Sequence, residues 1–318
     1  MMHLTSEANE RIARQCFGEP NPRLSTCREL RFGRRGSKAV NIERGVFADH
    51  EAGVSGGLLA MVVHAGAART AAEAARLLEG QGLTASRQTA AQRQEHARQQ
   101  GVEEQRRRAS AAILWAQASP LGGSLAELYL RQARAIDAAL ARADLRFLAA
   151  APVYPYDLHC RDRRPTMIGR VVDSTGRGIG AHLTYLRPDG RGKADFTPAR
   201  KCIGVVARGG IRLAAGSRLV IAEGIETALS AWEALGRQVP GLGCMATVSA
   251  GGMAHLVWPA GTIELFIAPD KDAGGAGERA AHTLAVRAHA SSLAVSFVPP
   301  PEAFNDWSAA AQAGWGRP

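Results

Sequence analysis

Three carboxylate side chains follow short apolar segments in the last third of the chain. Glu223 comes directly after the apolar segment 219–222, whereas Asp270 and Asp272 follow the apolar segment 265–269. Both segments have the length and composition of buried strands, and a helical pattern comes after each group of acids. Because the carboxyl ends of parallel strands form the ligand-binding edge of an α/β sheet, adjacent strands would bring these acids into one site.

Carboxylates that share a site repel each other, and a divalent cation relieves that repulsion. A small set of oxygen ligands suits Mg²⁺ or Mn²⁺, which keep several waters and bind substrate phosphates. We therefore expect Glu223, Asp270 and Asp272 to hold such a metal and to act on phosphate groups. The alternative is that the acids only cap helices and complement their dipoles. Two such strand ends, separated by one βα crossover, favour the functional interpretation.

The elements that must position these acids show an alternating pattern. Strand-like segments alternate with helical ones, with strands at 219–222, 245–249, 263–268 and 293–298 and helices at 226–235 and 276–290. This alternation predicts a mostly parallel four-stranded sheet with flanking helices, an α/β domain over residues 211–318.

The rest of the chain divides into three further parts. Residues 109–210 predict a basic α+β region, with a helical pattern to about residue 149 and strands at 167–172, 180–186 and 202–206. Residues 81–108 are rich in Gln and Arg and predict a helical linker. Residues 1–80 predict a small mixed β/α module, with strands at 29–32, 39–42 and 45–48 and a helix at 71–79.

The net charge of +10 is unevenly distributed over the 318 residues. Residues 1–110 and 111–210 carry net charges of +5 and +7, whereas residues 211–318 carry −2. A polyanion such as nucleic acid is therefore an expected partner of the first two thirds. Only four of the 39 basic residues are Lys, an Arg-rich composition that a GC-rich coding sequence also produces.

Two segments of the C-terminal part resemble a known domain. Residues 221–230 and 268–280, with Glu223 and the pair Asp270 and Asp272, are similar to the signature of a Toprim domain. This catalytic fold occurs in bacterial-type primases, in type IA and type II topoisomerases and in some nucleases. In the family, one Glu follows the first strand and an Asp-x-Asp motif follows a later one.

The resemblance extends to primases of phages, plasmids and other mobile elements. Residues 304–307 (Phe-Asn-Asp-Trp) resemble their closing element in an altered order, and segments 165–170, 180–185, 189–193 and 200–201 resemble the region that precedes their Toprim domain. Segments 29–33 and 49–53 are similar to their N-terminal DNA-binding module. The resemblance covers most of the chain and is strongest over residues 165–310.

The resemblance implies a Toprim primase-like nucleotidyltransferase that makes short primers on single-stranded DNA during replication of a mobile element. Its substrates would be nucleoside triphosphates, its metal Mg²⁺ or Mn²⁺, and its partner a separate replicative helicase. Glu223 would act as general acid or base or as a metal ligand, and Asp270 and Asp272 would hold the metal. Gly224 would let the backbone approach a phosphate.

Basic residues are the candidates for nucleotide and template binding. In the basic region and beside the acids these are Arg170, Lys193, Arg200, Lys201 and Lys271. A second group surrounds the predicted N-terminal hairpin turn and is a candidate DNA contact, namely Arg31, Arg34, Arg35 and Lys38. Each of these cations is alternatively a solvated surface residue.

The cysteines predict neither a disulfide framework nor a zinc ribbon. The chain has five Cys residues, far apart and without a C-x-x-C pair, which fits a reducing cytoplasm. Primases of this type commonly bind zinc in their N-terminal module, but Cys16, Cys27, His50 and His64 lack the required spacing, so we expect no zinc here. No apolar run is long enough to cross a membrane.

Two other functions remain open. A metal-dependent Toprim nuclease would use the same three acids, whereas a topoisomerase would need a nucleophilic Tyr in a winged-helix context that none of the four Tyr residues has. A non-catalytic nucleic-acid-binding protein with a vestigial Toprim domain is the second alternative. No P-loop is present, so the chain is not itself a helicase.

Overall fold

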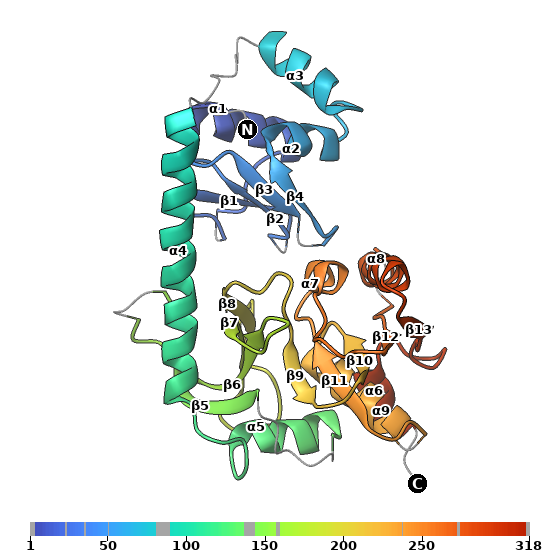
Figure 1. Cartoon of the computed structure of the whole chain (residues 1–318). Coiled ribbons are helices and arrows are strands. Elements are labelled where there is room, and N and C mark those ends of the chain that lie inside the picture. Colours follow the sequence, from blue (N-terminus) through green and yellow to red (C-terminus); the bar gives the residue numbers. More distant parts are fainter. Residues whose placement is uncertain are drawn as a thin grey trace. The chain divides into compact units, whose positions relative to one another are not determined.

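The computed structural model describes residues 4–22, 24–34, 36–49, 51–80, 90–136, 144–156, 160–236, 238–271 and 274–315, without the side chains of 90–93, 95 and 96. The chain divides into two compact units, Met1–Gln99 and Gln100–Pro318. The division falls within the long helix α4 (Ala90–Gln117), which Figure 1 shows together with the other elements.

The first unit is an antiparallel sheet with helices packed against it. Its elements are α1 (Ser6–Phe17), β1 (Glu29–Phe32), β2 (Lys38–Asn41), β3 (Val46–Asp49), β4 (Val54–Gly57), α2 (Leu58–His64) and α3 (Ala71–Gly80). Consecutive strands pair in the order β1-β2-β3-β4. Phe32, Val40 and Phe47 of the sheet bury their side chains with Ile12 and Met61 of the helices. The predicted strands and the helix at 71–79 are present, whereas the sequence pattern missed α1, β4 and α2.

After the second half of α4, the second unit contains a basic antiparallel sheet. The helical turn α5 (Leu125–Leu128) continues into the π-helical turn η1 (Tyr129–Ala133), and four strands follow in the order β5 (Leu145–Pro152), β6 (Arg163–Val172), β7 (Gly178–Tyr185) and β8 (Arg200–Gly204). The helical pattern predicted up to residue 149 is wrong from residue 145 onward. The Ala-rich segment there pairs with β6, so sheet pairing overrides its helical composition.

The sheet that carries the acids has five strands. They are β9 (Ile211–Ala214), β10 (Arg218–Ala222), β11 (Leu242–Ala246), β12 (Glu264–Ala268) and β13 (Ala294–Phe297), in the order β13-β12-β10-β11-β9. The four predicted strands run parallel, and β9 adds an antiparallel edge that the sequence pattern missed.

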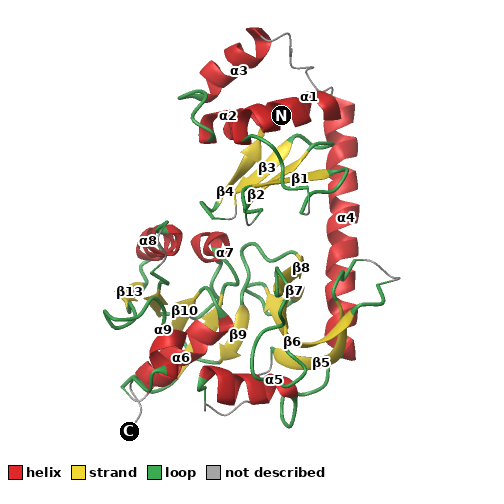
Figure 2. Cartoon of the chain, turned by 180° about the vertical axis from the view of Figure 1, so that it is seen from behind, coloured by secondary structure: helices red, strands yellow, loops and turns green. Residues whose placement is uncertain are grey.

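Helices cover both faces of this sheet (Figure 2). One face packs against α6 (Ile225–Gly236) and α9 (Trp307–Gln312), and the other against α7 (Ala250–His255) and α8 (Ala276–Ala290). The predicted helices at 226–235 and 276–290 correspond to α6 and α8, whereas α7 and α9 were not predicted. This arrangement is the α/β architecture expected from the alternating pattern.

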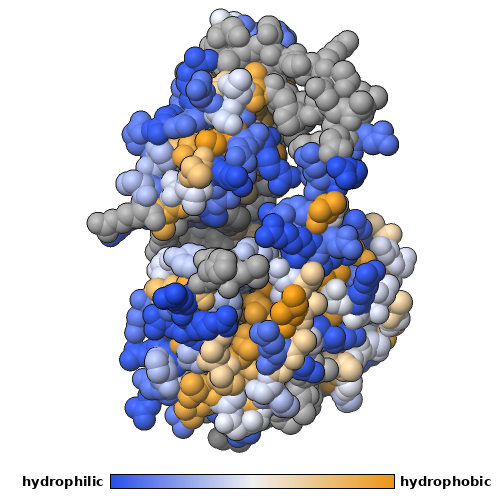
Figure 3. Space-filling view, turned by 90° about the vertical axis from the view of Figure 1, so that its left-hand side faces the viewer, coloured by the Kyte–Doolittle hydropathy of each residue, from blue (hydrophilic) through white to orange (hydrophobic). Residues whose placement is uncertain are grey.

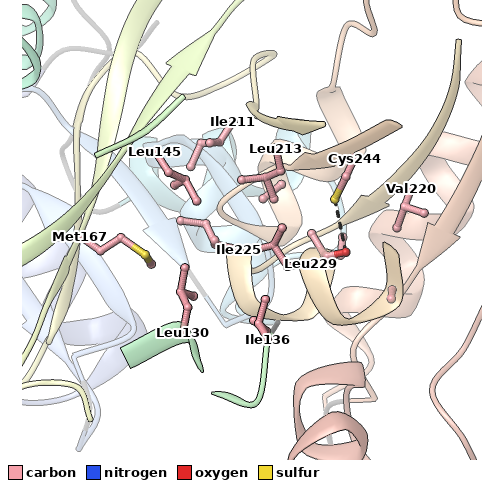
Figure 4. Close-up of a cluster of buried hydrophobic side chains, with 14 of the residues drawn as sticks. Leu130, Ile136, Leu145, Met167, Ile211, Leu213, Val220, Ile225, Leu229 and Cys244 are labelled. Carbon is pink, nitrogen blue, oxygen red and sulfur yellow. Dashed lines mark hydrogen bonds between the residues drawn. The ribbon is translucent and has the colours of Figure 1, made fainter. Parts of the chain in front are cut away.

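One apolar core joins the two sheets of the second unit. Figure 4 shows Leu130 of η1, Met167 of β6 and Ile211 of β9 converging on Ile225 and Leu229 of α6. All five side chains are at most 1% exposed. Because protein interiors are close-packed, this shared core fixes the basic sheet against the sheet that carries the acids.

The surface mixes apolar and polar residues. On the face shown in Figure 3, hydrophobic residues lie scattered among hydrophilic ones. None of the helices in the described ranges combines the length and the apolar character that a membrane crossing requires.

Candidate active site

Strand order brings two of the predicted acids together. β10 pairs with β12 in parallel, with Ala222 opposite Ala268, so the two strands end at the same level of the sheet. Glu223 follows Ala222 directly, and Asp270 stands two residues after Ala268. The third predicted acid, Asp272, lies outside the described residues.

Asp270 lies in surroundings that disfavour its negative charge. Burial, followed by the neighbouring carboxylates of Glu223 and Asp306, raises the pKa of Asp270 to about 7, although the Thr227 hydroxyl and Arg200 oppose the shift. Its Oδ1 atom is buried and accepts no hydrogen bond from the described residues. An orphaned oxygen among like charges is the environment that a divalent cation stabilises.

The donor set therefore fits Mg²⁺ or Mn²⁺. Glu223 and Asp270 would hold the ion, with Asp306 close enough to add negative charge. Within the described ranges, no group of three His, Cys, Asp or Glu side chains is arranged as a complete metal site. Two carboxylates with water and substrate oxygens match the way proteins usually bind Mg²⁺.

Asp306 is a contributor that the sequence analysis did not single out. It caps α9 by accepting a hydrogen bond from Ala309 N at 2.6 Å. Lys271 N donates to Asn305 O at 2.7 Å, which ties the segment before α9 to the end of β12. The signal in the sequence that points to this residue is the segment 304–307, which resembles the closing element of Toprim primases.

A pocket of about 510 Å³ opens beside Glu223. Glu223 lines it together with three of the predicted cations, Lys193, Arg200 and Lys201. The lining also includes His182, Cys202 and Val248. Val248 has a φ of 60°, a strained conformation for a β-branched residue. Its N–H donates to Glu223 O at 2.8 Å, so this strained turn fixes the backbone of Glu223.

The three cations of the pocket differ in their contacts. The Lys193 ammonium lies 3.1 Å from Glu226 Oε1, whereas Lys201 Nζ donates to Val153 O at 2.6 Å. Arg200 makes no ion pair within the described part of the chain, and its positive charge acts on Asp270. Arg200 is therefore the cation best able to bind a phosphate.

Glu226 belongs to a buried network. Tyr129 OH donates to Glu226 Oε1 at 2.5 Å and accepts from Arg134 Nε at 2.8 Å. Burial alone would raise the pKa of Glu226, but Lys193, Tyr129 and Arg134 together lower it. The network joins η1 to α6 and holds Lys193 at the pocket. Its members Tyr129 and Arg134 carry no motif that would have revealed this role.

The remaining candidates of the second unit lie in other settings. Arg170 Nε donates to the buried Asp144 at 2.7 Å and does not line the pocket. Lys271 Nζ donates to Pro300 O at 3.2 Å. Apart from the two neighbouring residues, a Cβ atom on Gly224 would come no closer than 3.5 Å to a described atom, the Thr227 Oγ1 atom, so internal packing does not require a glycine there.

The N-terminal candidates lie in the first unit. Arg31 pairs with Glu29 at 2.7 Å and Lys38 with Asp49 at 3.6 Å. Arg34 is exposed and forms no ion pair with the residues that the structure describes. Arg35 and His50 lie outside the described residues.

Comparison with protein-family models identifies two regions. Residues 218–314 match the Toprim domain, and residues 105–213 match a domain of unknown function, DUF7146. The comparison with curated protein sequences found no match.

The comparison with solved structures found several primases. The zinc-binding and RNA polymerase domains of the Aquifex aeolicus primase share 13% identity, with a TM-score of 0.43 over 99% of this chain and 83% of that one. The DnaG primase catalytic domain bound to ssDNA shares 15% identity, with a TM-score of 0.42 over 66% and 78% of the two chains. The primase fragment of the bacteriophage T7 primase-helicase protein shares 16% identity, with a TM-score of 0.33 over 48% and 60%. The family match over residues 218–314 shows that the C-terminal part of this chain is a Toprim domain, as the sequence predicted.

Proposed function

We propose that this chain is a Toprim primase-like nucleotidyltransferase, a DNA-directed RNA polymerase that makes short primers on single-stranded DNA. The observation that carries the proposal is the pairing of Glu223 and Asp270 at adjacent strand ends, beside a pocket that Arg200 and Lys193 line. Clustered carboxylates next to cations suit a reaction in which a metal and a phosphate chain meet.

The proposed reaction joins two nucleotides. The 3′-oxygen of one nucleotide forms a bond with the α-phosphorus of the next, and the bond from that phosphorus to the bridging oxygen breaks, so that pyrophosphate leaves with the electron pair. The hydroxyl proton passes to water, or to Glu223 where that carboxylate acts as the base and leaves the metal to Asp270 and Asp272. Arg200 holds the triphosphate, and Glu223 with Asp270 and Asp272 would hold the metal. When bound, Mg²⁺ or Mn²⁺ supplies positive charge that stabilises the attacking and leaving oxygens.

The proposal includes the setting of the reaction. The substrates are nucleoside triphosphates and a single-stranded DNA template, and a separate helicase opens the duplex. The basic N-terminal turn, in which Arg34 forms no ion pair with described residues, contributes a contact with the template. We place the activity in the cytoplasm, in replication of a phage, a plasmid or another mobile element.

Primer synthesis tests the proposal directly. Labelled ribonucleotides and mixed single-stranded templates are incubated with Mg²⁺ or Mn²⁺ and with wild type or the double variant Asp270→Ala/Asp272→Ala. Short template-dependent products from wild type alone are expected. A degraded template without products would instead indicate a nuclease. DNA binding that is independent of metal, with no turnover, would indicate a non-catalytic binding protein.

A further inference from the structure

One buried polar atom on a side chain of the pocket has no hydrogen-bond partner among the described residues. His182 is 6% exposed and lines the pocket together with Glu223, Lys193 and Arg200. Its Nδ1 atom is buried and makes no hydrogen bond with any described residue. Most buried polar atoms in native proteins are hydrogen-bonded, so an unpaired one on a residue that lines a cavity points to a partner that binds there.

The position of His182 follows from the register of the basic sheet. On β7, His182 lies opposite Cys202 and Thr184 lies opposite Arg200. Side chains alternate along a strand, so His182 and Thr184 share one face, whereas Leu183 and Tyr185 turn into the apolar core of the other face. β7 lies between β6 and β8 in the sheet, so its backbone at His182 is paired on both sides.

The chemistry of His182 differs from that of its charged neighbours. Burial, together with the positive charges of Arg200 and Lys193, lowers the pKa of His182 to about 4, and Glu226 only partly opposes this. The ring is therefore uncharged at neutral pH and offers one donor and one acceptor. Cations suit phosphates, whereas a neutral ring suits an uncharged hydroxyl or amide.

We propose that His182 hydrogen-bonds through Nδ1 to an uncharged group of the nucleoside, a ribose hydroxyl or a base edge, when a nucleotide occupies this pocket. His182 would then help to select the nucleotide, while Arg200 and Lys193 bind its phosphates. The volume of about 510 Å³ lies within the usual range for small-molecule sites. This inference rests on the proposed function, because it requires a nucleotide at this pocket.

Thr184 provides a matched control. It is fully buried on the same face of the same strand, and its Oγ1 atom also makes no hydrogen bond with the described residues. Unlike His182, Thr184 does not line the pocket. If His182 binds the ligand, only substitution of His182 should change nucleotide affinity. If any unpaired buried polar atom affects the affinity, substitutions of His182 and of Thr184 should both change it.

The test compares nucleotide binding with binding of the phosphates alone. Affinities for ATP, dATP and tripolyphosphate are measured by calorimetry with Mg²⁺ for wild type, His182→Leu, His182→Asn and Thr184→Val. We expect His182→Leu to weaken ATP binding about 10-fold, the loss of roughly one hydrogen bond, and to leave tripolyphosphate binding unchanged. His182→Asn keeps a polar atom near the Nδ1 position and should bind ATP within about 3-fold of wild type. Thr184→Val should bind ATP with the same affinity as wild type.

The affinity for dATP, compared with that for ATP, identifies the nucleoside group that Nδ1 of His182 binds. If Nδ1 binds the 2′-hydroxyl, wild type prefers ATP and His182→Leu loses that preference. If it binds another hydroxyl or the base, His182→Leu weakens ATP and dATP equally. If His182→Leu fails to fold, His182→Asn and His182→Gln carry the test, because the Gln amide replaces Nε2 rather than Nδ1 and should bind ATP more weakly.

Two results would overturn the inference, and they differ from a failure of the proposed function. The specific role of His182 would be excluded if folded His182→Leu bound ATP as tightly as wild type does. It would also be excluded if His182→Leu lost as much affinity for tripolyphosphate as for ATP. If wild type binds neither ATP nor tripolyphosphate, the proposed function itself fails.

Discussion

Two aspartates of the second unit have opposite surroundings. Asp144 is fully buried, and its oxygens accept hydrogen bonds from Arg170 Nε at 2.7 Å and Arg212 Nε at 2.8 Å. Asp270, at the end of β12, has a buried Oδ1 atom with no described partner and lies near the carboxylates of Glu223 and Asp306. The same residue type is thus neutralised in one place and surrounded by like charges in the other.

We interpret this difference as that between a structural charge at Asp144 and the proposed metal-binding charge at Asp270. The charge of a buried carboxylate with two guanidinium partners is compensated without a ligand, and the carboxylate fixes the elements that supply those partners. A carboxylate held among like charges costs stability and persists where a cation compensates it. The cations divide in the same way, because Arg170 is paired with Asp144, whereas Arg200 forms no ion pair with a described residue.

The largest expected effect is on activity at Asp270. Asp270→Asn should lower primer synthesis by roughly 1,000-fold, because it removes a charge on which metal binding and phosphate transfer depend. It should leave the thermal midpoint unchanged or higher, since it relieves repulsion from Glu223. Product formation and thermal unfolding are measured on the same preparation, and an active Asp270→Asn would contradict the functional assignment.

The matched change at Asp144 should give the reverse result. Asp144→Asn leaves Arg170 and Arg212 without their buried counter-charge, and we expect the free energy of unfolding to fall by about 3 kcal/mol. The activity of the folded fraction should remain within about 3-fold of wild type. Denaturant unfolding measures the loss, and an undiminished stability would mean that Asp144 is not a structural anchor.

A smaller effect concerns pH. The pKa of His182 is lowered to about 4 in the folded protein from an ordinary value of 6.5, so the unfolded chain binds a proton first as the pH falls. The stability that neutral His182 contributes is complete above about pH 6.5 and is lost as the pH falls toward 4, by about 2 kcal/mol between pH 7 and pH 5. His182→Asn should flatten this decline in denaturant unfolding, and an equally steep decline would show that other groups cause it.

The smallest effect compares two arginines of the first unit. Arg34 forms no ion pair with described residues, whereas Arg31 pairs with Glu29 at 2.7 Å. Arg34→Gln should weaken binding of single-stranded DNA about 3-fold and reduce the salt slope by about 1, and Arg31→Gln should change both less. Fluorescence anisotropy at several salt concentrations measures both quantities. Equal effects of the two substitutions would remove the distinction between paired and unpaired cations.

The sequence predicted those features that depend on local pattern. The βα alternation after residue 218 predicted the parallel strands and placed Glu223 and Asp270 at strand ends, and β10 and β12 prove to be neighbours. That adjacency depends on strand order, which the pattern left open. The sequence pattern predicts a helix where β5 begins, because the Ala-rich composition of this segment does not reveal its pairing with β6.

The partners of the basic residues were not predictable from local pattern. Arg170 and Arg200 look alike in the sequence, yet Arg170 meets Asp144, 26 residues away, and Arg200 lines the pocket. The partner of Lys193 is Glu226, which lies on α6, a helix packed against the five-stranded sheet. Such pairings are set by packing between distant elements, so only the structure distinguishes a structural cation from a candidate ligand.

Direct measurement of cation binding tests the central claim. Mn²⁺ binding is followed by electron paramagnetic resonance for wild type, Asp270→Asn and Asp144→Asn. The account predicts that wild type and folded Asp144→Asn bind Mn²⁺ with similar affinity, and that Asp270→Asn binds it at least about 10-fold more weakly, since it loses a carboxylate ligand. Equal Mn²⁺ affinity in wild type and Asp270→Asn would contradict the claim that the strand-end carboxylates form the metal site.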